Sequence, residues 1–197
     1  MENYVVTISR QFASFGRSIA QRLSSELSVE FYDRDIVEAT AKRMGQPIPV
    51  ISNEEENAHP VFFRRKYPLG MGVANIQDEI FNVQSNIIRD IAQRESCIIV
   101  GRCAGHVLRD HPRCLNVFVY SPYERRLKNC IEALQMDQKV AKKMIRDVDK
   151  ARENYRHRYC PELKNAYEGY DIMIDSSRFG IERSAKILAD IVRSQFL

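Results

Sequence analysis

Four short runs of apolar residues divide the chain, and within them apolar residues do not alternate cleanly with polar ones. The runs are Tyr4–Ile8, Cys97–Val100, Leu115–Tyr120 and Tyr170–Ile174, and Val29–Tyr32 is a weaker fifth. Short runs rich in Val, Ile and Tyr are typical of strands that helices cover on both faces. The pattern therefore predicts a sheet of buried strands.

Between these runs, apolar residues recur at intervals of three and four, the spacing of one helix face. The stripes are Ile19, Ala20, Leu23 and Leu27; Ile76, Ile80, Val83, Ile87 and Ile91; Val140, Met144, Ile145 and Val148; and Ile187, Ile191 and Val192. Strands that alternate with helices predict an α/β fold with a parallel sheet and right-handed crossovers. A chain of 197 residues suits a single domain, 1–197.

Two connections are too long to be simple crossovers. The first, residues 33–91, carries Gly45–Pro49, the acidic run Glu54–Glu56 and a turn-rich stretch from His59 to Gly72. The second is the basic segment 123–165. Ligands bind α/β sheets beyond the carboxyl ends of the strands, so we expect both excursions to border the binding site.

Charge is distributed unevenly along the chain. Residues 123–165 contain twelve Lys or Arg against seven Asp or Glu, so this segment carries the positive excess behind the net charge of +4. A local excess suits an anionic ligand, and equally a solvated helical face. Since 44% of the residues are hydrophobic, a disordered chain is excluded.

Cysteine usage and the absence of long apolar runs bear on the compartment. The five cysteines are odd in number and form no Cys-x-x-Cys pair, which predicts reduced thiols in a cytoplasmic protein and no zinc site. No apolar run approaches the length of a membrane span, and the N-terminus does not have the pattern of a secretory signal.

The first strand leads into a turn and then a helix, the setting of a phosphate-binding loop. Against Gly-x-x-x-x-Gly-Lys-Ser/Thr, Gly16 matches the second glycine and Ser18 the hydroxyl residue, while Gln11 and Arg17 replace the first glycine and the lysine. The N–H groups at the start of the helix would face a phosphate, Arg17 would offset its charge, and Ser18 would ligate Mg²⁺. The alternative is an ordinary strand–turn–helix junction with Arg17 in solvent.

Two further candidates follow predicted strands. Asp33 ends the weak strand, where its carboxylate would help to hold Mg²⁺ or orient an acceptor, or would cap the next helix. Arg102 follows Gly101 after a buried strand, where its forked donor suits a substrate phosphate, or where it pairs with Asp110 or Glu95.

The basic segment supplies a third group. On a helix, Asp149, Arg152 and Arg156 share one face. Two arginines oriented by a carboxylate would clamp a transferring phosphoryl group, because phosphoryl transfer needs positioning and charge compensation. The alternative is an exposed helix with salt bridges along its surface.

Taken together, these pieces resemble the cytidylate-kinase-like family of P-loop kinases, a branch of the nucleoside monophosphate kinases. The resemblance runs from Val5 to about Val192. It rests on Ile8–Gln11, Gly16-Arg17, Phe31–Arg34, Val100–Cys103, Asp149–Arg152, Tyr170-Asp171 and Ile174–Glu182.

The resemblance implies the three-layer P-loop kinase fold, with a five-stranded parallel sheet in the order 2-3-1-4-5 and helices on both faces. Residues 33–91 would then form a monophosphate-binding excursion. The segment 123–165 would contain a helical lid.

It also implies roles for individual residues. Ser14, Phe15, Gly16, Arg17 and Ser18 would hold the ATP phosphates, with Mg²⁺ bound by Ser18 through ATP. Ser177 and Gly180, in a loop 176–180, would border the adenine. Asp33, Arg34 and Arg102 would face the acceptor. Arg152 and Arg156 would close over the phosphates while Asp149 steadies them. The implied catalytic set is Arg17, Asp33, Arg102, Arg152 and Arg156. The implied reaction is Mg²⁺-dependent transfer of the ATP γ-phosphate to a small nucleotide, CMP or dCMP.

Three other functions stay open at this point. Related loops read closer to Gly-Ser-Gly-Gly-Arg, so Ala13 and Phe15 leave room for a nucleotide-binding regulatory protein without catalysis. The same fold hosts kinases for acceptors that are not nucleotides. Tyr155 and Tyr159 interleave with arginines as in nucleic-acid binding, but no nucleic-acid motif accompanies them. We therefore expect a small-molecule partner, with neither nucleic acid nor membrane, and the sequence does not set the oligomeric state.

Overall fold

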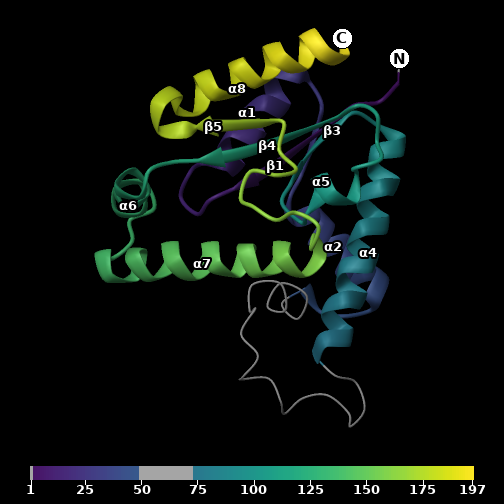
Figure 1. Ribbon diagram of the computed structural model, residues 1–197, viewed down its shortest axis with the longest axis horizontal. Coiled ribbons are helices and arrows are strands. Elements are labelled where there is room, and N and C mark those ends of the chain that lie inside the picture. Colours follow the sequence, from purple (N-terminus) through teal and green to yellow (C-terminus); the bar gives the residue numbers. More distant parts are fainter. Residues whose placement is uncertain (1, 49–72) are drawn as a thin grey trace.

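The computed structural model describes residues 2–48 and 73–197 (Figure 1). The acidic run Glu54–Glu56 and the stretch from His59 to Gly72 lie outside the described residues. The strands are β1 (Val5–Arg10), β2 (Glu30–Tyr32), β3 (Cys97–Val100), β4 (Cys114–Tyr120) and β5 (Ile172–Asp175). The helices are α1 (Gly16–Leu27), α2 (Arg34–Met44), α4 (Val73–Arg94), α5 (Ala104–Val107), α6 (Tyr123–Glu132), α7 (Gln138–Tyr159) and α8 (Ser176–Phe196).

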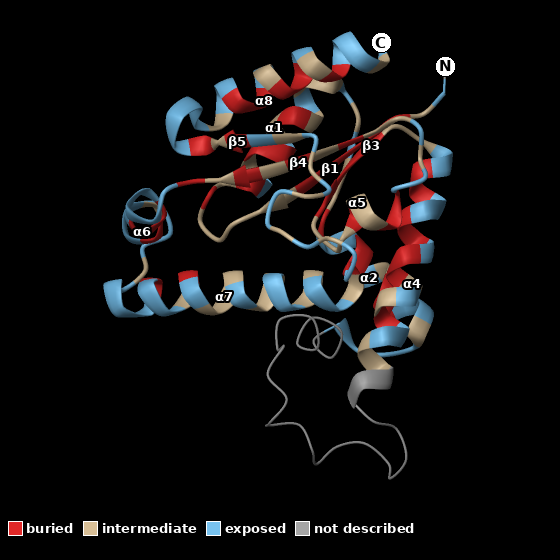
Figure 2. Ribbon diagram, viewed as in Figure 1, coloured by how far each residue is buried: buried red, intermediate tan, exposed pale blue. Residues whose placement is uncertain are grey.

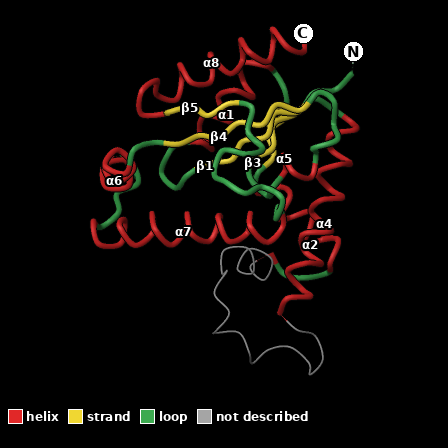
Figure 3. Tube along the Cα trace, in the orientation of Figure 1, coloured by secondary structure: helices red, strands yellow, loops and turns green. Residues whose placement is uncertain are grey.

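The five strands form one parallel sheet in the order β2-β3-β1-β4-β5 (Figure 3). Central strand β1 pairs with both β3 and β4, so that Val5 lies opposite Cys97 on one side and Cys114 on the other. The predicted strands are thus confirmed, and so are the fold class and the strand order. Because all strands run the same way, the segments that follow β1, β2 and β3 meet at one edge of the sheet.

Helices pack on both faces of the sheet (Figure 2). Val6 and Ile8 of β1 point toward α1 and α8, whereas Val5 points toward the side of α2, α4 and α5. All three valine and isoleucine side chains are fully buried, and each such burial contributes about 1.5–3 kcal/mol to folding. This packing explains the continuous apolar runs of the central strands.

Two details differ from the sequence pattern. Val140, expected within the buried stripe of its helix, is 50% exposed, because Ala141 and Ile145 form the inner face of α7 against Leu127 and Cys130 of α6. Strand β5 begins at Ile172 rather than at Tyr170, whose ring packs against Phe118.

Helix α8 begins where a loop was expected. Ser176–Phe179 form its first turn, the Ser176 hydroxyl donates to the carbonyl of Tyr120, and Asp175 accepts a hydrogen bond from the Ser177 N–H. The helix is interrupted at Gly180, where φ is 69°. The expected loop 176–180 is therefore a helical turn with a break at its end.

All five cysteines are free thiols. None of the helices within the described ranges is both long enough and apolar enough to cross a membrane.

Candidate functional site

The turn between β1 and α1 has a left-handed backbone at both positions where related loops carry glycine. Ala13 and Phe15 both have left-handed conformations, with φ of 58° and 59°. Glycine occupies this region without penalty, whereas another residue pays a cost of about 1–2 kcal/mol. The surrounding structure therefore imposes the bend that glycine would adopt readily.

Part of that constraint comes from Ser14, whose side chain is fully buried. Its hydroxyl lies 2.9 Å from the carbonyl oxygen of Gln11 and 3.1 Å from that of Val119. The Gln11 side chain in turn accepts a hydrogen bond from the Ser121 N–H. Ser14 thus fixes the loop with its hydroxyl, and only its backbone can face a ligand.

Helices α6 and α7 also constrain the backbone of the loop between β1 and α1. The Asp149 carboxylate accepts a hydrogen bond of 2.7 Å from the Phe12 N–H and pairs with Arg126. Arg126 also donates to the carbonyl of Phe12, and Asn129 donates to that of Ala13. Asp149, expected to steady the bound phosphates, therefore holds the loop itself in this structure.

The left-handed backbone at Ala13 would be relaxed in the Ala13→Gly variant, whereas glycine also increases the entropy of the unfolded chain. The first effect exceeds the second, so we expect this variant to raise the free energy of unfolding by up to about 1 kcal/mol. Ala20→Gly in α1 is the matched control and should lower it by about 1 kcal/mol, since Ala20 is helical and buried. Urea denaturation measures both. A loss of stability in Ala13→Gly equal to that in Ala20→Gly would contradict this account.

Helix α1 begins at Gly16, directly after the loop. A Cβ on Gly16 would lie 2.5 Å from the Cβ of Arg10, so glycine is required for the helix to start against the end of β1. Arg17 and Ser18 occupy the first turn, where unpaired N–H groups and the helix dipole favour an anion. These residues fit the expected binding of phosphate at this helix end.

Asp33 lies at the end of β2 with its side chain only 10% exposed. Its carboxylate is 2.8 Å from Nε of Arg17 and 3.9 Å from Nη2 of Arg10. Although Asp33 occupies the N-cap position of α2, its side chain makes no capping hydrogen bond. Asp33 thus has the predicted N-cap position, but its carboxylate faces the arginines instead of capping the N–H groups of α2. Arg34, the first residue of α2, is exposed.

The turn after β3 brings Arg102 to the same edge. Gly101, Arg102 and Cys103 all have positive φ, of 78°, 59° and 50°. The two carboxylates considered as partners of Arg102 have other contacts: Glu95 accepts from the Tyr32 hydroxyl, and Asp110 pairs with Arg109. Arg102 is close enough to Arg10 for its charge to lower the pKa of Arg10.

A hydrogen bond between two thiols connects the end of α7 to the turn after β3. The Cys103 thiol forms a hydrogen bond with Cys160, the residue that follows α7, and this bond lowers the pKa of Cys160. Nδ1 of His106 in α5 lies 2.6 Å from a carboxylate oxygen of Glu162. These contacts connect the end of the basic helix to the turn that follows β3.

Two arginines of helix α7, Arg152 and Arg156, contact the body of the protein. Nη1 of Arg152 donates to the carbonyl of Arg10 at 3.0 Å, and Nη1 of Arg156 donates to that of Asn165 at 3.1 Å. The helix runs from α6 to α4 (Figure 1), where the Tyr159 ring stacks on Phe81 at 4.0 Å. Arg152 thus reaches the edge where β1 ends, whereas Arg156 contacts the segment after the helix.

Arg10 is a residue of this edge that the sequence reasoning did not single out. It is the last residue of β1, its side chain is 21% exposed, and a Cβ on Gly101 would lie 2.2 Å from its Nη1. Burial, followed by the positive charges of Arg152, Arg102 and Arg17, lowers its pKa against the opposing effect of Asp33. A guanidinium remains charged at neutral pH despite such a shift. Arg10 is part of the family motif Ile8–Gln11, which could have indicated its importance. The predicted strand, however, ended at Ile8, so Arg10 was not placed at the end of a strand.

Four arginines therefore gather at this edge. Arg17, Arg102 and Arg152 all lie close enough to Arg10 for their charges to lower its pKa. The buried Asp33 carboxylate contacts two of the four, Arg17 and Arg10. Like charges in a partly desolvated site repel one another, so the arrangement is suited to a ligand with several negative charges. Phosphate groups match the forked donors of arginine.

The donor set also fits Mg²⁺ bound through a nucleotide. Among the described residues no group of three or more His, Cys, Asp or Glu side chains could hold a metal ion by itself. Mg²⁺ is commonly held by one or two protein oxygens together with substrate phosphates. The Ser18 hydroxyl in the first turn of α1 and the Asp33 carboxylate are the oxygens that would contribute.

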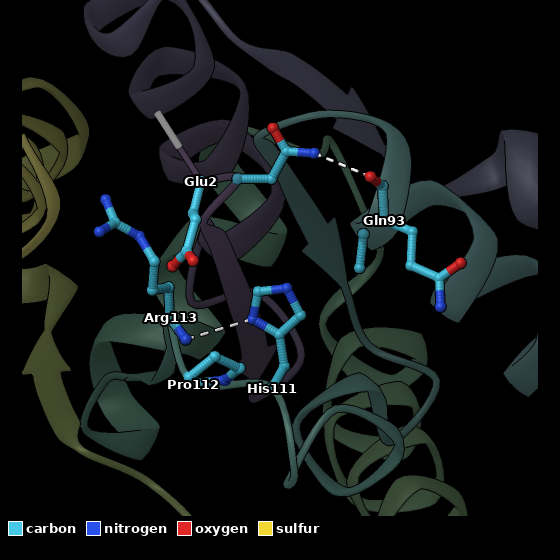
Figure 4. Close-up of a pocket in the computed structure, with 7 residues that line it drawn as sticks. Glu2, Gln93, His111, Pro112 and Arg113 are labelled. Carbon is cyan, nitrogen blue, oxygen red and sulfur yellow. Dashed lines mark hydrogen bonds between the residues drawn. The ribbon is translucent and has the colours of Figure 1, made fainter.

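A separate pocket of about 360 Å³ lies near the N-terminus (Figure 4). Glu2, Gln93, His111 and Arg113 contribute to its walls, and the Arg113 N–H donates to Nδ1 of His111. These residues precede β1, β3 and β4, so the pocket lies at the amino ends of the strands. It is thus distinct from the arginine-lined edge at their carboxyl ends.

The sheet order, the loop between β1 and α1 and the arginines at the carboxyl edge together define a protein with the P-loop kinase fold. The chain belongs to the cytidylate kinase-like family, because the model of that family matches residues 5–178. Comparison with curated proteins finds no match.

Solved structures share this fold at low sequence identity. An uncharacterized protein from Eubacterium ventriosum ATCC 27560 is 23% identical with a TM-score of 0.73, over 98% of this chain and 99% of that one. Shikimate kinase from Acinetobacter baumannii, in complex with shikimate, is 15% identical with a TM-score of 0.56, over 99% and 96%. YorR protein from Bacillus subtilis, in complex with phosphorylated GDP, is 10% identical with a TM-score of 0.52, over 96% and 95%.

Proposed function

We propose that this protein transfers the γ-phosphoryl group of ATP, with Mg²⁺, to a nucleoside monophosphate, with CMP or dCMP as the preferred acceptor. The observation that carries the proposal is the gathering of Arg17, Arg102 and Arg152 around Arg10 beside the start of α1, with the Asp33 carboxylate in contact with Arg10 and Arg17. Membership of the cytidylate kinase-like family supports the choice of a pyrimidine nucleotide.

The donor side would use the N–H groups of the first turn of α1 for the phosphates of ATP. Arg17 would leave its pair with Asp33 and contact these phosphates, and Ser18 would contribute an oxygen to Mg²⁺. Bound Mg²⁺ supplies charge compensation between the phosphates of the donor. The left-handed Ala13 and Phe15 support a functional loop, since the backbone keeps the bend without the glycines.

The acceptor side would use Asp33 and Arg34, which follow β2 where the excursion 33–91 begins, and Arg102, which follows the neighbouring strand β3. Arg152, with Arg156 behind it on α7, would stabilise the transferring group from the opposite side, as the lid segment 123–165 closes. Transfer of a phosphoryl group requires alignment of donor and acceptor and stabilisation of negative charge, and arginines provide both.

Thermal unfolding with ligands tests this proposal. ATP–Mg²⁺ and CMP, each at about one hundred times its dissociation constant, should each stabilise the protein by roughly 2.7 kcal/mol. ADP formation should require CMP or dCMP together with Mg²⁺. Stabilisation by ATP with turnover only on an acceptor that is not a nucleotide would replace CMP in the proposal. Binding of both nucleotides without turnover would favour the regulatory alternative, and no stabilisation by any nucleotide would overturn the proposal.

A further inference from the structure

The last side chain of β1 points away from the ATP side of the site. Nη1 of Arg10 lies against Gly101 in the turn after β3, and Nη2 faces Asp33 after β2. In the sheet order β2-β3-β1-β4-β5, both neighbours lie on the β2–β3 side of β1. The phosphate-binding loop is instead fixed on the β4 side, through Val119 and Ser121. The head group of Arg10 therefore belongs to the half of the edge from which the excursion departs.

The Arg10 side chain passes two glycines. Gly16 leaves room for its Cβ and Gly101 leaves room for Nη1 of its guanidinium, so a side chain at either glycine would collide with Arg10. Its one ion pair among the described residues is the long contact of 3.9 Å to Asp33, and Asp33 is engaged more closely by Arg17. A guanidinium carries five N–H donors, most of which this contact does not use.

We propose that Arg10 binds the anionic group of the acceptor, a phosphate or a carboxylate, and so restricts the reaction to acceptors that carry one. This proposal rests on the proposed function for the assignment of an acceptor side, and it adds the residue that selects the acceptor by its charge.

The electrostatics of the ligand-free site support the proposal. Arg10 has a lowered pKa because of burial and of three neighbouring guanidinium groups. The folded protein therefore accommodates the charged side chain less well than the unfolded chain does, and removal of the charge should not destabilise the ligand-free fold. A residue that only supported the fold would have the opposite effect. An anion bound against Arg10 would offset the repulsion.

The experiment compares wild-type protein with Arg10→Met and Arg10→Lys, using inorganic phosphate, CMP and ATP–Mg²⁺ as separate probes in calorimetry. Methionine preserves the stem that packs against Gly16 and removes the charge, whereas lysine keeps the charge without the fork. Arg146→Met is the matched control, because Arg146 lies on α7 with a side chain 72% exposed and pairs with Asp147.

We expect Arg10→Met to weaken binding of inorganic phosphate and of CMP by about 10- to 100-fold, with Arg10→Lys between it and wild type. ATP–Mg²⁺ binding should change by no more than about twofold, and the melting temperature of the ligand-free variant should equal or exceed that of wild type. Arg146→Met should bind all three probes as wild type does. With turnover, the KM for the acceptor should rise while the KM for ATP stays constant.

Four results would overturn the proposal. The first is unchanged phosphate and CMP binding in Arg10→Met, and the second is an equal loss of ATP–Mg²⁺ binding in that variant. The third is a lower melting temperature of both ligand-free variants together with loss of every ligand, and the fourth is binding of CMP but not of inorganic phosphate by the wild-type protein. The binding assay needs no turnover. If no acceptor is phosphorylated, the proposed function is contradicted. The role of Arg10 is then tested by phosphate binding alone. A wild-type protein that binds CMP but not inorganic phosphate would place recognition on the nucleoside and overturn the role of Arg10.

Discussion

Arg152→Ala is expected to slow the ATP-dependent phosphoryl transfer by about 10³-fold, because an arginine that stabilises the transferring group contributes effects of this size. Arg152 reaches the carboxyl edge of the sheet from α7, where it donates to the carbonyl of Arg10. From there its charge would compensate the negative charge of the transferred group under the proposed function. The turnover number from ADP formation, at saturating ATP–Mg²⁺ and acceptor, measures the effect.

The stability of the ligand-free protein should change little in the same variant. Removal of Arg152 deletes its hydrogen bond to the carbonyl of Arg10, but it also removes the neighbouring charge with the largest effect on the pKa of Arg10. These two contributions oppose each other, and each is on the order of 1 kcal/mol. Urea denaturation thus separates a catalytic effect from a folding defect.

Two variants sharpen the comparison. Arg152→Lys should recover part of the rate, because it restores the charge without the forked geometry. Arg146→Ala removes an arginine from the exposed face of the same helix and should leave the rate unchanged. A rate in Arg152→Ala within tenfold of wild type would show that α7 contributes no catalytic arginine at this position.

The sequence predicted the sheet because its strands are covered on both sides. Val5, Val6 and Ile8 are all fully buried, and Thr7, the polar residue of their run, is buried as well, so the run has the composition of a covered strand. The same parallel arrangement made the meeting of Asp33 and Arg102 at one edge predictable, since each follows a strand. Edge strand β2 has only three residues, none of them fully buried, and gave the weakest signal.

The contacts within the site were harder to predict because they depend on distant segments. Asp149 and Arg126 belong to different helices, and no spacing along the chain indicates that they meet at the backbone of Phe12. Ser14 matched the position of a phosphate-binding serine, yet its hydroxyl satisfies two carbonyls of the interior. Tertiary packing determines which atoms such side chains contact, whereas a sequence motif gives only the place of the residue in the chain.

Asp149→Ala is expected to lower the free energy of unfolding by about 3 kcal/mol, because it leaves a buried charge without its partner. The Arg126 side chain is only 9% exposed and pairs with Asp149, and its Nε is buried with no hydrogen-bond partner among the described residues. The Phe12 N–H loses its acceptor in the same variant. Urea denaturation of the ligand-free protein measures the loss.

Asp147→Ala is the matched control on the same helix. Asp147 pairs with Lys143 and Arg146, whose side chains are 71% and 72% exposed, and ion pairs of this kind contribute about 0–1 kcal/mol. Combining Asp149→Ala with Arg126→Met should recover part of the lost stability, because the second substitution removes the buried charge. Additive losses in the double variant would contradict a direct coupling of the two residues.

The Asp149 variants also decide between two roles of the carboxylate. If Asp149 holds the loop, as its contacts with Phe12 and Arg126 indicate, Asp149→Ala destabilises the ligand-free protein and weakens ATP binding as a consequence. If Asp149 instead steadied bound phosphates directly, ATP binding would change while the ligand-free stability stayed within about 1 kcal/mol of wild type. Asp149→Asn keeps an acceptor for the Phe12 N–H and removes the charge, so it should lose less stability than Asp149→Ala under the first role. Because an aspartate that shapes a phosphate-binding loop acts before any ligand arrives, the unfolding experiment without nucleotide is the decisive one.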